Sequence, residues 1–244
     1  MKKLLSLRNV CKSFESETRK NEVLDNISFD IFENEIVSII GPSGCGKSTI
    51  LNIISKLDNN FEGEIDLLSK TGYMFQKDCL LPWKNVLDNI KLGLEIKKGI
   101  DETSLSYINS LIEKYGLKDF IHNYPNELSG GMRQRVSLIR TLSLSPDLLL
   151  MDEPFSALDY QTKLFVQEDV YKILKKEKKS ALIVTHDISE AIALSSRIII
   201  LSKRPCKILK NIDIHFKTQS PNERRIMPKF QEYYHQIESI LRTN

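Results

Sequence analysis

Residues 41–49 constrain the fold of this 244-residue chain more than any other stretch. They read GPSGCGKST and match the phosphate-binding loop pattern G-x-x-x-x-G-K-[ST]. An apolar run at 36–40 enters the loop, and the residues from Thr49 onward have helical character. A strand, a glycine-rich turn and a helix in this order predict an α/β fold that binds a nucleotide polyphosphate at the turn.

The residue types of this loop suit that chemistry. Its glycines are expected to let the backbone turn sharply, so that successive N–H groups point into one concavity. Lys47 is expected to reach the β- and γ-phosphates, and the hydroxyl of Ser48 to ligate Mg²⁺. A glycine-rich turn without a ligand explains the glycines but not the adjacent Lys47, Ser48 and Thr49. The predicted nucleotide-binding residues of the loop are Gly41, Pro42, Ser43, Gly44, Cys45, Gly46, Lys47, Ser48 and Thr49.

Composition limits the possible function classes. The chain has 35 basic and 32 acidic residues, and its net charge of +3 is too small to argue for a nucleic-acid partner. The one dense basic run, 172–179, is interpreted as a solvated helix face. No apolar run approaches the ~18 residues of a membrane span, and Arg8 cuts short a signal-peptide-like start. We expect the protein in the cytoplasm, or against a membrane by way of a partner.

The four cysteines are far apart in the sequence. Cys11, Cys45, Cys79 and Cys206 form no C-x-x-C pair, so neither zinc nor a disulfide framework is predicted. Cys45 lies beside a helix N-terminus and Lys47, which can stabilise its thiolate and make it sensitive to alkylation. The alternative is a small residue that fills a non-critical loop position.

Apolar alternation predicts strands in the first third of the chain. Residues 3–10 and 23–32 alternate on period two, with a polar loop at 15–21 between them. A short strand is predicted at 63–67 and a buried strand at 72–76. From Val86 the pattern becomes helical, and the apolar residues that carry it are Val86, Ile90, Leu94, Leu105, Ile108, Leu111, Ile112 and Tyr115.

Continuous apolar runs resume after this helical block. The runs at 148–151, 181–184 and 198–201 are typical of strands buried on both faces of a parallel sheet. Strand–helix–strand order implies right-handed crossovers. The helix predicted at 162–178 is expected to face inward with Phe165, Val170, Ile173 and Leu174.

The tail begins near Asn211, and Pro228 opens its final helix at the first helical position. One apolar stripe of this helix is expected to pack on the core. The patterns divide one domain, residues 1–244, into three parts. These are a nucleotide-binding core at 1–76 and 144–210, a helical subdomain at 77–143, and the tail at 211–244.

An acidic pair follows the predicted strand at 148–151. Asp152 and Glu153 therefore lie at a strand end, where a parallel sheet places catalytic groups. Asp152 is predicted to hold the Mg²⁺ shell, and Glu153 to point toward the γ-phosphate and polarise a water. With the upstream phosphate loop, the pair predicts a Walker B site.

A second glycine-rich helix start lies at 128–135, with the sequence LSGGMRQR. Two glycines follow Ser129, ahead of a helix with Met132, Val136 and Ile139 on one side. This pattern predicts another anion-binding helix N-terminus. A monomer has no obvious use for a second phosphate-binding helix N-terminus so distant in sequence from the first.

In these motifs the chain resembles the ATP-binding subunits of ABC transporters. The LSGG sequence is similar to their signature motif, and the resemblance covers residues 3 to about 206. Four further motifs occur in the family's order: the adenine-stacking aromatic at Phe14, the Q-loop at Gln76, the D-loop at 156–159 with Asp159, and the switch histidine at His186.

The resemblance implies a RecA-like P-loop NTPase core with a mainly parallel sheet, an N-terminal antiparallel β portion and an inserted helical subdomain. It implies a head-to-tail homodimer in which each ATP lies between the phosphate loop of one chain and the signature of the other. The signature and D-loop residues that bind the nucleotide are then Ser129, Gly130, Gly131 and Asp159.

The resemblance also assigns catalytic roles. Glu153 is implied as the general base for the attacking water, with Gln76 and His186 sensing the γ-phosphate. Lys47 neutralises charge that develops in phosphoryl transfer, and Gln76 joins the Mg²⁺ shell with Ser48 and Asp152. Hydrolysis releases the closed dimer and drives a separate membrane permease, which places the subunit on the inner face of the cell membrane.

A finer match lies at 75–86. Its pattern F-Q-x-x-x-L-L-P-W-x-x-V resembles the nitrate/sulfonate/taurine importer subgroup. Arg204–Pro205 and Arg224–Arg225 also look like that subgroup, whereas Cys206 replaces a glycine. Leu81 and Trp83 are expected to line the groove that receives a permease helix, with a core Trp as the alternative.

Two other classes are less consistent with the sequence. A non-transport ABC ATPase of nucleic-acid or translation processes predicts a long coiled-coil insertion or two cassettes, but 128 − 76 = 52 positions separate Gln76 from Leu128, and there is one cassette. A non-enzymatic P-loop protein is expected to lack the base, and Glu153 is present. The solute is not encoded here, because a permease and a solute-binding protein would recognise it.

Overall fold

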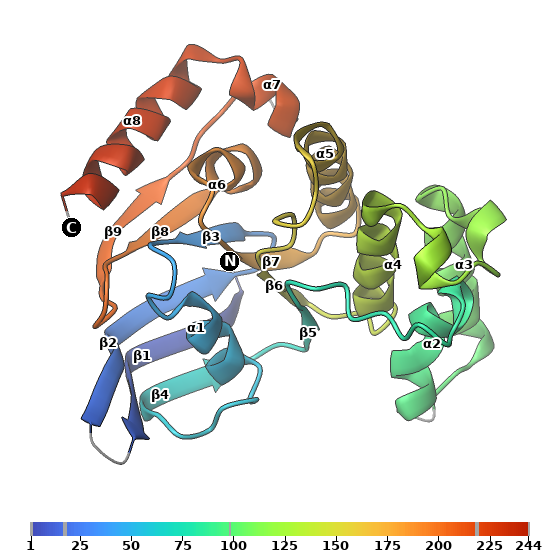
Figure 1. The fold of residues 1–244 in the computed structure, drawn as a ribbon, viewed down its shortest axis with the longest axis horizontal. Helices are drawn as coiled ribbons and strands as arrows, with labels where there is room; N and C mark the ends of the chain where they lie inside the picture. Colours follow the sequence, from blue (N-terminus) through green and yellow to red (C-terminus); the bar gives the residue numbers. More distant parts are fainter. Residues whose placement is uncertain (1, 17–18, 98, 218–219, 244) are drawn as a thin grey trace.

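The computed structural model describes residues 2–16, 19–97, 99–217 and 220–243. The ends of the predicted domain, Met1 and Asn244, lie outside the described residues, as do positions 17 and 18 of the predicted polar loop. The chain forms two sheets with helices around them (Figure 1).

The smaller sheet is antiparallel, as expected for the N-terminal part. Its strands have the order β2-β1-β4, with β1 at Lys3–Ser16, β2 at Arg19–Phe32 and β4 at Glu62–Leu67. Pairing of β1 with β2 continues through Phe14 and Asn21 to Glu15 and Lys20. The predicted polar loop at 15–21 is therefore wrong over most of its length, because ladder hydrogen bonds between backbones require no apolar alternation.

The larger sheet has the strand order β5-β6-β7-β3-β8-β9. Neighbouring strands from β5 to β8 are parallel, and β9 is antiparallel to β8. The bounds are β3 Ile36–Ile40, β5 Thr71–Met74, β6 Leu148–Asp152, β7 Ser180–Thr185, β8 Arg197–Leu201 and β9 Ile208–Asp213. The predicted parallel strands are confirmed. The strand predicted at 72–76 ends early, at Met74, so Phe75 and Gln76 lie beyond it.

Helices surround this sheet. Their bounds are α1 Lys47–Ile54, α2 Val86–Ile96, α3 Glu102–Lys114, α4 Gly130–Leu142, α5 Tyr160–Lys176, α6 Ile188–Leu194, α7 Pro221–Arg225 and α8 Pro228–Arg242. Two 3₁₀ turns lie at Lys118–Phe120 and Pro125–Glu127. Within the described part of the segment from Gln76 to Leu128, α2 and α3 have 11 and 13 residues, too few for a long coiled coil.

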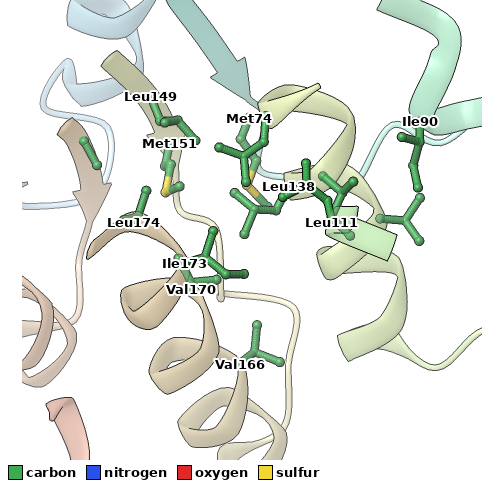
Figure 2. Close-up of a cluster of buried hydrophobic side chains, with 14 of the residues drawn as sticks. Met74, Ile90, Leu111, Leu138, Leu149, Met151, Val166, Val170, Ile173 and Leu174 are labelled. Carbon is green, nitrogen blue, oxygen red and sulfur yellow. The ribbon is translucent and has the colours of Figure 1, made fainter. Parts of the chain in front are cut away.

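The central sheet separates two cores, because successive side chains of a strand point to opposite faces. Leu148 and Leu150 of β6 pack with α1 and the antiparallel sheet. Leu149 and Met151 pack with the helices on the other face (Figure 2). In that figure Leu138 of α4 lies among residues of β6, α5 and the helical segment, so this cluster joins α2–α4 to the sheet. Burying each such side chain contributes up to about 1.5–3 kcal/mol.

Helix α5 differs from its prediction. It runs from Tyr160 to Lys176 rather than over 162–178, and Lys178 follows it with a positive φ of 49°. Phe165 does not face inward as predicted, because it is 70% exposed. Val166 and Val170 supply the buried stripe together with Ile173 and Leu174.

The C-terminal segment packs back on the core. Helix α8 begins with Pro228 as predicted and buries Phe230 and Ile237 against α6 and β8. The boundary predicted at residue 211 falls inside β9, and α7 was not predicted. Figure 1 shows α7 beside α5 and α6, and α8 along the outer edge of the molecule. No helix in the described ranges is both long and apolar enough to cross a bilayer.

Candidate nucleotide-hydrolysis site

The phosphate loop connects β3 to α1. Gly44 and Gly46 have φ of 74° and 129°, in the left-handed region that favours glycine. A Cβ atom on Gly46 would lie 2.8 Å from Cδ2 of Leu24, so close packing also requires glycine at this position. The first N–H groups of α1 have no partners within the helix and are available to an anion.

Lys47 is the buried cation of this loop. Its side chain is 5% exposed, and Nζ donates to the carbonyl oxygens of Gly41 and Pro42, each at 2.9 Å. Both acceptors are neutral. A phosphate oxygen would be a stronger acceptor, because hydrogen bonds between ionised groups are roughly twice as strong as neutral ones.

Ser48 and Asp152 meet at the loop. The hydroxyl of Ser48 donates to Oδ1 of Asp152 at 3.1 Å. Burial raises the pKa of Asp152 above its ordinary value, and the charge of Glu153 adds to this, although Ser48 and Lys47 oppose it. A divalent cation would stabilise the ionised carboxylate. The hydroxyl and carboxylate of this pair fit Mg²⁺, which binds through one or two carboxylates plus phosphate oxygens and water.

Glu153 contacts two of the other predicted catalytic residues, Gln76 and His186. Its carboxylate accepts a hydrogen bond from Nε2 of Gln76 at 3.4 Å through Oε2, and its Oε1 lies 3.2 Å from Nδ1 of His186. The three residues follow β5, β6 and β7, which are adjacent in the sheet. They therefore meet at the carboxyl edge of the parallel strands, where open α/β sheets bind ligands.

The backbone at Glu153 is in an unusual conformation. Its φ is 43°, and its N–H donates to the carbonyl oxygen of Val184 at 2.8 Å. Non-glycine residues hold such angles at a cost of about 1–3 kcal/mol, and surrounding structure must enforce them. The hydrogen bond to Val184 of β7 stabilises this conformation of the Glu153 backbone, in which the carboxylate contacts Gln76 and His186.

Phe14 lies at the mouth of a separate cavity. It is 47% exposed and lines a cavity of about 590 Å³ that Leu24 and Phe61 also line. Leu24 is the residue nearest to Gly46, so this cavity adjoins the phosphate loop. Nζ of Lys12 lies 4.7 Å from the centroid of the Phe14 ring. An exposed aromatic face beside the loop suits the predicted stacking on a base.

Cys45 has a partner that the sequence did not reveal. The thiols of Cys45 and Cys206 are both buried, and they interact. The hydrogen bond from Cys206 lowers the pKa of Cys45 to about 7, with help from Lys47 and against the effect of burial. Cys45 also lines a hollow of about 460 Å³ beside Lys203 and Arg204. The lowered pKa agrees with the interpretation of a stabilised thiolate, which stays a prediction.

The signature residues begin α4. Ser129 caps the helix, and its side chain accepts from the N–H of Met132 at 3.3 Å. Gly131 is packed against α5, because a Cβ atom there would lie 3.0 Å from Cγ2 of Thr162. Nε of Arg133 donates to Oδ2 of Asp78 at 3.0 Å, which ties this helix start to the segment after Gln76.

Asp159 and Trp83 lie apart from the catalytic cluster. Asp159 caps α5, and its carboxylate accepts from the N–H of Thr162 at 3.1 Å; hydrogen bonds from the side chain and the backbone of Thr162 lower its pKa. Its nucleotide-binding role stays a prediction. Trp83 is 71% exposed, so the alternative of a core Trp is wrong.

Comparisons with known proteins decide the family. The model of the ABC transporter family matches residues 24–156, more than half of the 244-residue chain. The chain belongs to the ABC transporter family. It is an ATP-binding subunit, and therefore an ATPase, with the fold of the family's cassettes.

Three relatives of this ABC subunit illustrate the match. It is 43% identical to the aliphatic sulfonates import ATP-binding protein SsuB of Bacillus cereus, over 86% of this chain and 85% of the relative. It is 39% identical to the taurine import ATP-binding protein TauB of Rhizobium johnstonii, over 91% and 90%. A solved dimeric ATP-binding cassette in a post-hydrolysis state, bound to ADP and phosphate, superposes with a TM-score of 0.74 at 32% identity, covering 87% and 99%.

Proposed function

We propose that this subunit hydrolyses ATP with Mg²⁺ in a head-to-tail homodimer and drives solute import through a separate permease. The observation that carries the proposal is the contact of Glu153 with both Gln76 and His186, beside the Ser48–Asp152 pair. A carboxylate aimed by two γ-phosphate sensors and next to a metal site is suited to activate water.

Each residue has a defined task in this reaction. Glu153 accepts a proton from the attacking water, and the oxygen of that water forms a bond to the γ-phosphorus. The bond from phosphorus to the β–γ bridging oxygen breaks, which yields ADP and phosphate. Lys47 neutralises charge on the phosphate oxygens, and Ser48 and Asp152 would hold a magnesium ion that would supply further positive charge there. Gln76 and His186 hold the Glu153 carboxylate and contact the γ-phosphate.

The second half of each site comes from the partner copy in this proposal. Ser129 and the Gly131 amide supply hydrogen bonds to the γ-phosphate across the dimer, because their helix start is an anion-binding terminus. Gly130 and Asp159 lie on the same interface. The dimeric form of the solved cassette supports this arrangement.

Import and the membrane partner rest on two further observations. The relatives SsuB and TauB are named for the import of aliphatic sulfonates and of taurine. Phe75, which precedes Gln76, and Trp83, later in the same segment, are 43% and 71% exposed, which suits a surface that a permease helix covers. The subunit would lie on the cytoplasmic face of the cell membrane, with a solute of the nitrate, sulfonate or taurine type delivered by a binding protein.

Glu153→Gln tests the proposal. Removing the base is expected to lower turnover by about 10²–10⁴-fold. ATP binding persists, so an ATP-bound dimer accumulates. Hydrolysis is measured by phosphate release and dimerisation by light scattering, with Glu232→Gln on the exposed face of α8 as the control. Wild-type turnover in Glu153→Gln would show that another group activates the water.

A further inference from the structure

Helix α7 carries two arginines into the seam between α5 and α6. The first, Arg224, is 6% exposed. Its Nη1 donates to the carbonyl oxygens of Ala193 and Ser195 at 2.9 and 3.2 Å, and its Nη2 donates to the hydroxyl of Tyr171 at 3.0 Å. The carbonyls at the end of a helix have no partners within it and carry partial negative charge. Arg224 therefore anchors α7 to the C-terminal end of α6.

The second arginine reaches the opposite end of α6. Nη2 of Arg225 donates to Oε1 of Gln167 in α5, and its Nη1 donates to the carbonyl oxygen of Ser189 at 3.5 Å. Burial lowers the pKa of Arg225, but a guanidinium remains charged in proteins. Arg225 therefore places a cation at the first turn of α6 and fixes the amide of Gln167.

Gln167 connects Arg225 to a set of ionisable side chains in α5 and at the start of α6. It is fully buried, and its Nε2 donates to Oε2 of Glu190 at 3.3 Å. Nζ of Lys163 lies 3.2 Å from the same oxygen of Glu190 and 2.7 Å from Oδ2 of Asp187. Burial raises the pKa of Asp187, but the bond and charge of Lys163 more than offset this and keep it below its ordinary value. The buried network thus ends on an ionised Asp187.

Asp187 sets the backbone next to the switch histidine. Its Oδ1 accepts from the N–H of Glu190 at 3.1 Å and caps α6. Its own N–H donates to Oγ1 of Thr185 at 3.1 Å. These two bonds hold the backbone on both sides of His186.

His186 depends on this backbone for its position. Its side chain is 55% exposed, and its Nδ1 lies 3.2 Å from Glu153. A ring that protrudes into solvent has little packing to orient it, so the segment behind it determines where Nδ1 lies. Since a misplacement of about 1 Å can cost as much as 10²-fold in rate, small changes in this segment affect hydrolysis.

We propose that Arg225 is a positioning residue for ATP hydrolysis, which acts through Gln167, Glu190, Lys163 and Asp187 to hold His186 against Glu153. The C-terminal segment thereby becomes part of the hydrolysis machinery, although no residue of α7 contacts Glu153 among the contacts described. This inference rests on the proposed role of His186 in the reaction.

Arg225→Ala tests the proposal from α7, and Gln167→Met tests the same link from α5. Each variant is expected to lower kcat by about tenfold and to change KM for ATP by less than about twofold, because the phosphate loop is untouched. Arg225→Lys keeps the charge and one donor and is expected to recover part of kcat. Arg242→Ala is the matched control, since Arg242 lies in α8 of the same tail and pairs with Glu238.

A readout without nucleotide accompanies the kinetics. Hydrogen exchange of the amides at 185–190 is expected to accelerate in Arg225→Ala and not in Arg242→Ala. If Arg225→Ala fails to fold, Gln167→Met and Arg225→Lys still decide the question. Wild-type kcat in Gln167→Met, or a rise in KM that accounts for the whole loss, would overturn the proposal.

His186→Ala separates this inference from the proposed function. The double variant His186→Ala/Arg225→Ala is expected to be no slower than His186→Ala alone, because both changes act through one ring. If His186→Ala retains wild-type turnover, the proposed function of His186 fails. If His186→Ala hydrolyses ATP slowly and the Arg225→Ala change lowers the rate of that variant further, only the positioning role of Arg225 fails.

Discussion

Two glycine-rich helix starts in this chain differ in how complete they are. At the phosphate loop, Lys47 is buried, Ser48 bonds to Asp152, and Glu153 follows directly. At the signature, Ser129 is exposed and caps its own helix, and Gly131 packs against Thr162. The first has the proposed metal-binding and catalytic groups around it within one chain, whereas Ser129 and Gly131 at the second serve capping and packing.

This difference indicates what each chain can do alone. The phosphate loop has the groups needed to hold a nucleotide, so binding requires one copy. The signature has the anion-binding helix start, and the Asp78 carboxylate near it is bonded to Arg133, so we expect it to function only against a second copy in the proposed dimer. Nucleotide binding and hydrolysis should therefore respond differently to changes at the two sites.

The largest expected effect on ATP affinity comes from a change at Lys47. Lys47→Ala removes the charge-assisted bond to the phosphates, worth about 1.5–3 kcal/mol, so ATP affinity should fall by about 10- to 100-fold. Ser129→Asp, in contrast, should leave ATP affinity unchanged and abolish turnover. Equilibrium binding of a fluorescent ATP analogue to dilute protein checks this, with Lys70→Ala at an exposed position as the control. Equal losses of ATP affinity in Lys47→Ala and Ser129→Asp would contradict the proposed difference between the two sites.

A smaller effect is expected for the backbones of the two sites. Gly46→Ala forces a side chain into a φ of 129° and against Leu24, and should destabilise the protein by about 1–3 kcal/mol. A Cβ atom in Gly130→Ala would lie 3.3 Å from Cδ2 of Leu158 and 3.9 Å from Nη2 of Arg133, both ends of flexible side chains, so the change in stability should stay within about 0.5 kcal/mol. Urea unfolding without nucleotide measures both. Similar losses would mean that the two loops are equally constrained.

The smallest effect concerns Cys45. Cys206→Ala removes the hydrogen bond that lowers the pKa of Cys45 to about 7, so this pKa should rise. Since the thiolate is the reactive form, alkylation of Cys45 at pH 7 should slow by about fivefold. In the wild type the rate should rise steeply as pH increases through 7, and in the variant only at higher pH. Mass spectrometry follows the modification, with Cys11→Ala as the control, and an unchanged rate would contradict the pairing.

Sequence patterns predicted most of the fold, because burial on both faces leaves continuous apolar runs. The runs ending at Met151 and Val184 became adjacent parallel strands, and the run ending at Leu201 became a further parallel strand on the other side of β3. The predictions were wrong where local composition did not reflect backbone pairing or side-chain burial. The β1–β2 hairpin extends through polar residues whose backbones pair, and Phe165 is apolar but lies beside the buried stripe rather than in it.

The site was predictable only where residues follow a motif. Gln76, Glu153 and His186 lie in separate motifs that the family resemblance assigned to one site, and the sheet order explains why they meet. Cys206 and Arg225 were not assigned roles, because their partners lie far away in the sequence. The departure from glycine at Cys206 and the Arg224–Arg225 pair were visible signals, but only the fold shows what they contact.

The molecular mass of ATP-bound Glu153→Gln variants tests the shared site most directly. Ser129→Asp keeps a side chain that can cap the helix but places negative charge beside the proposed γ-phosphate, and Ser129→Asn is its neutral, capping control. With ATP and Mg²⁺, light scattering should give a dimer for Glu153→Gln and Glu153→Gln/Ser129→Asn. Glu153→Gln/Ser129→Asp should remain a monomer that still binds one ATP. A dimer of unchanged stability in that variant would contradict a site shared between two copies.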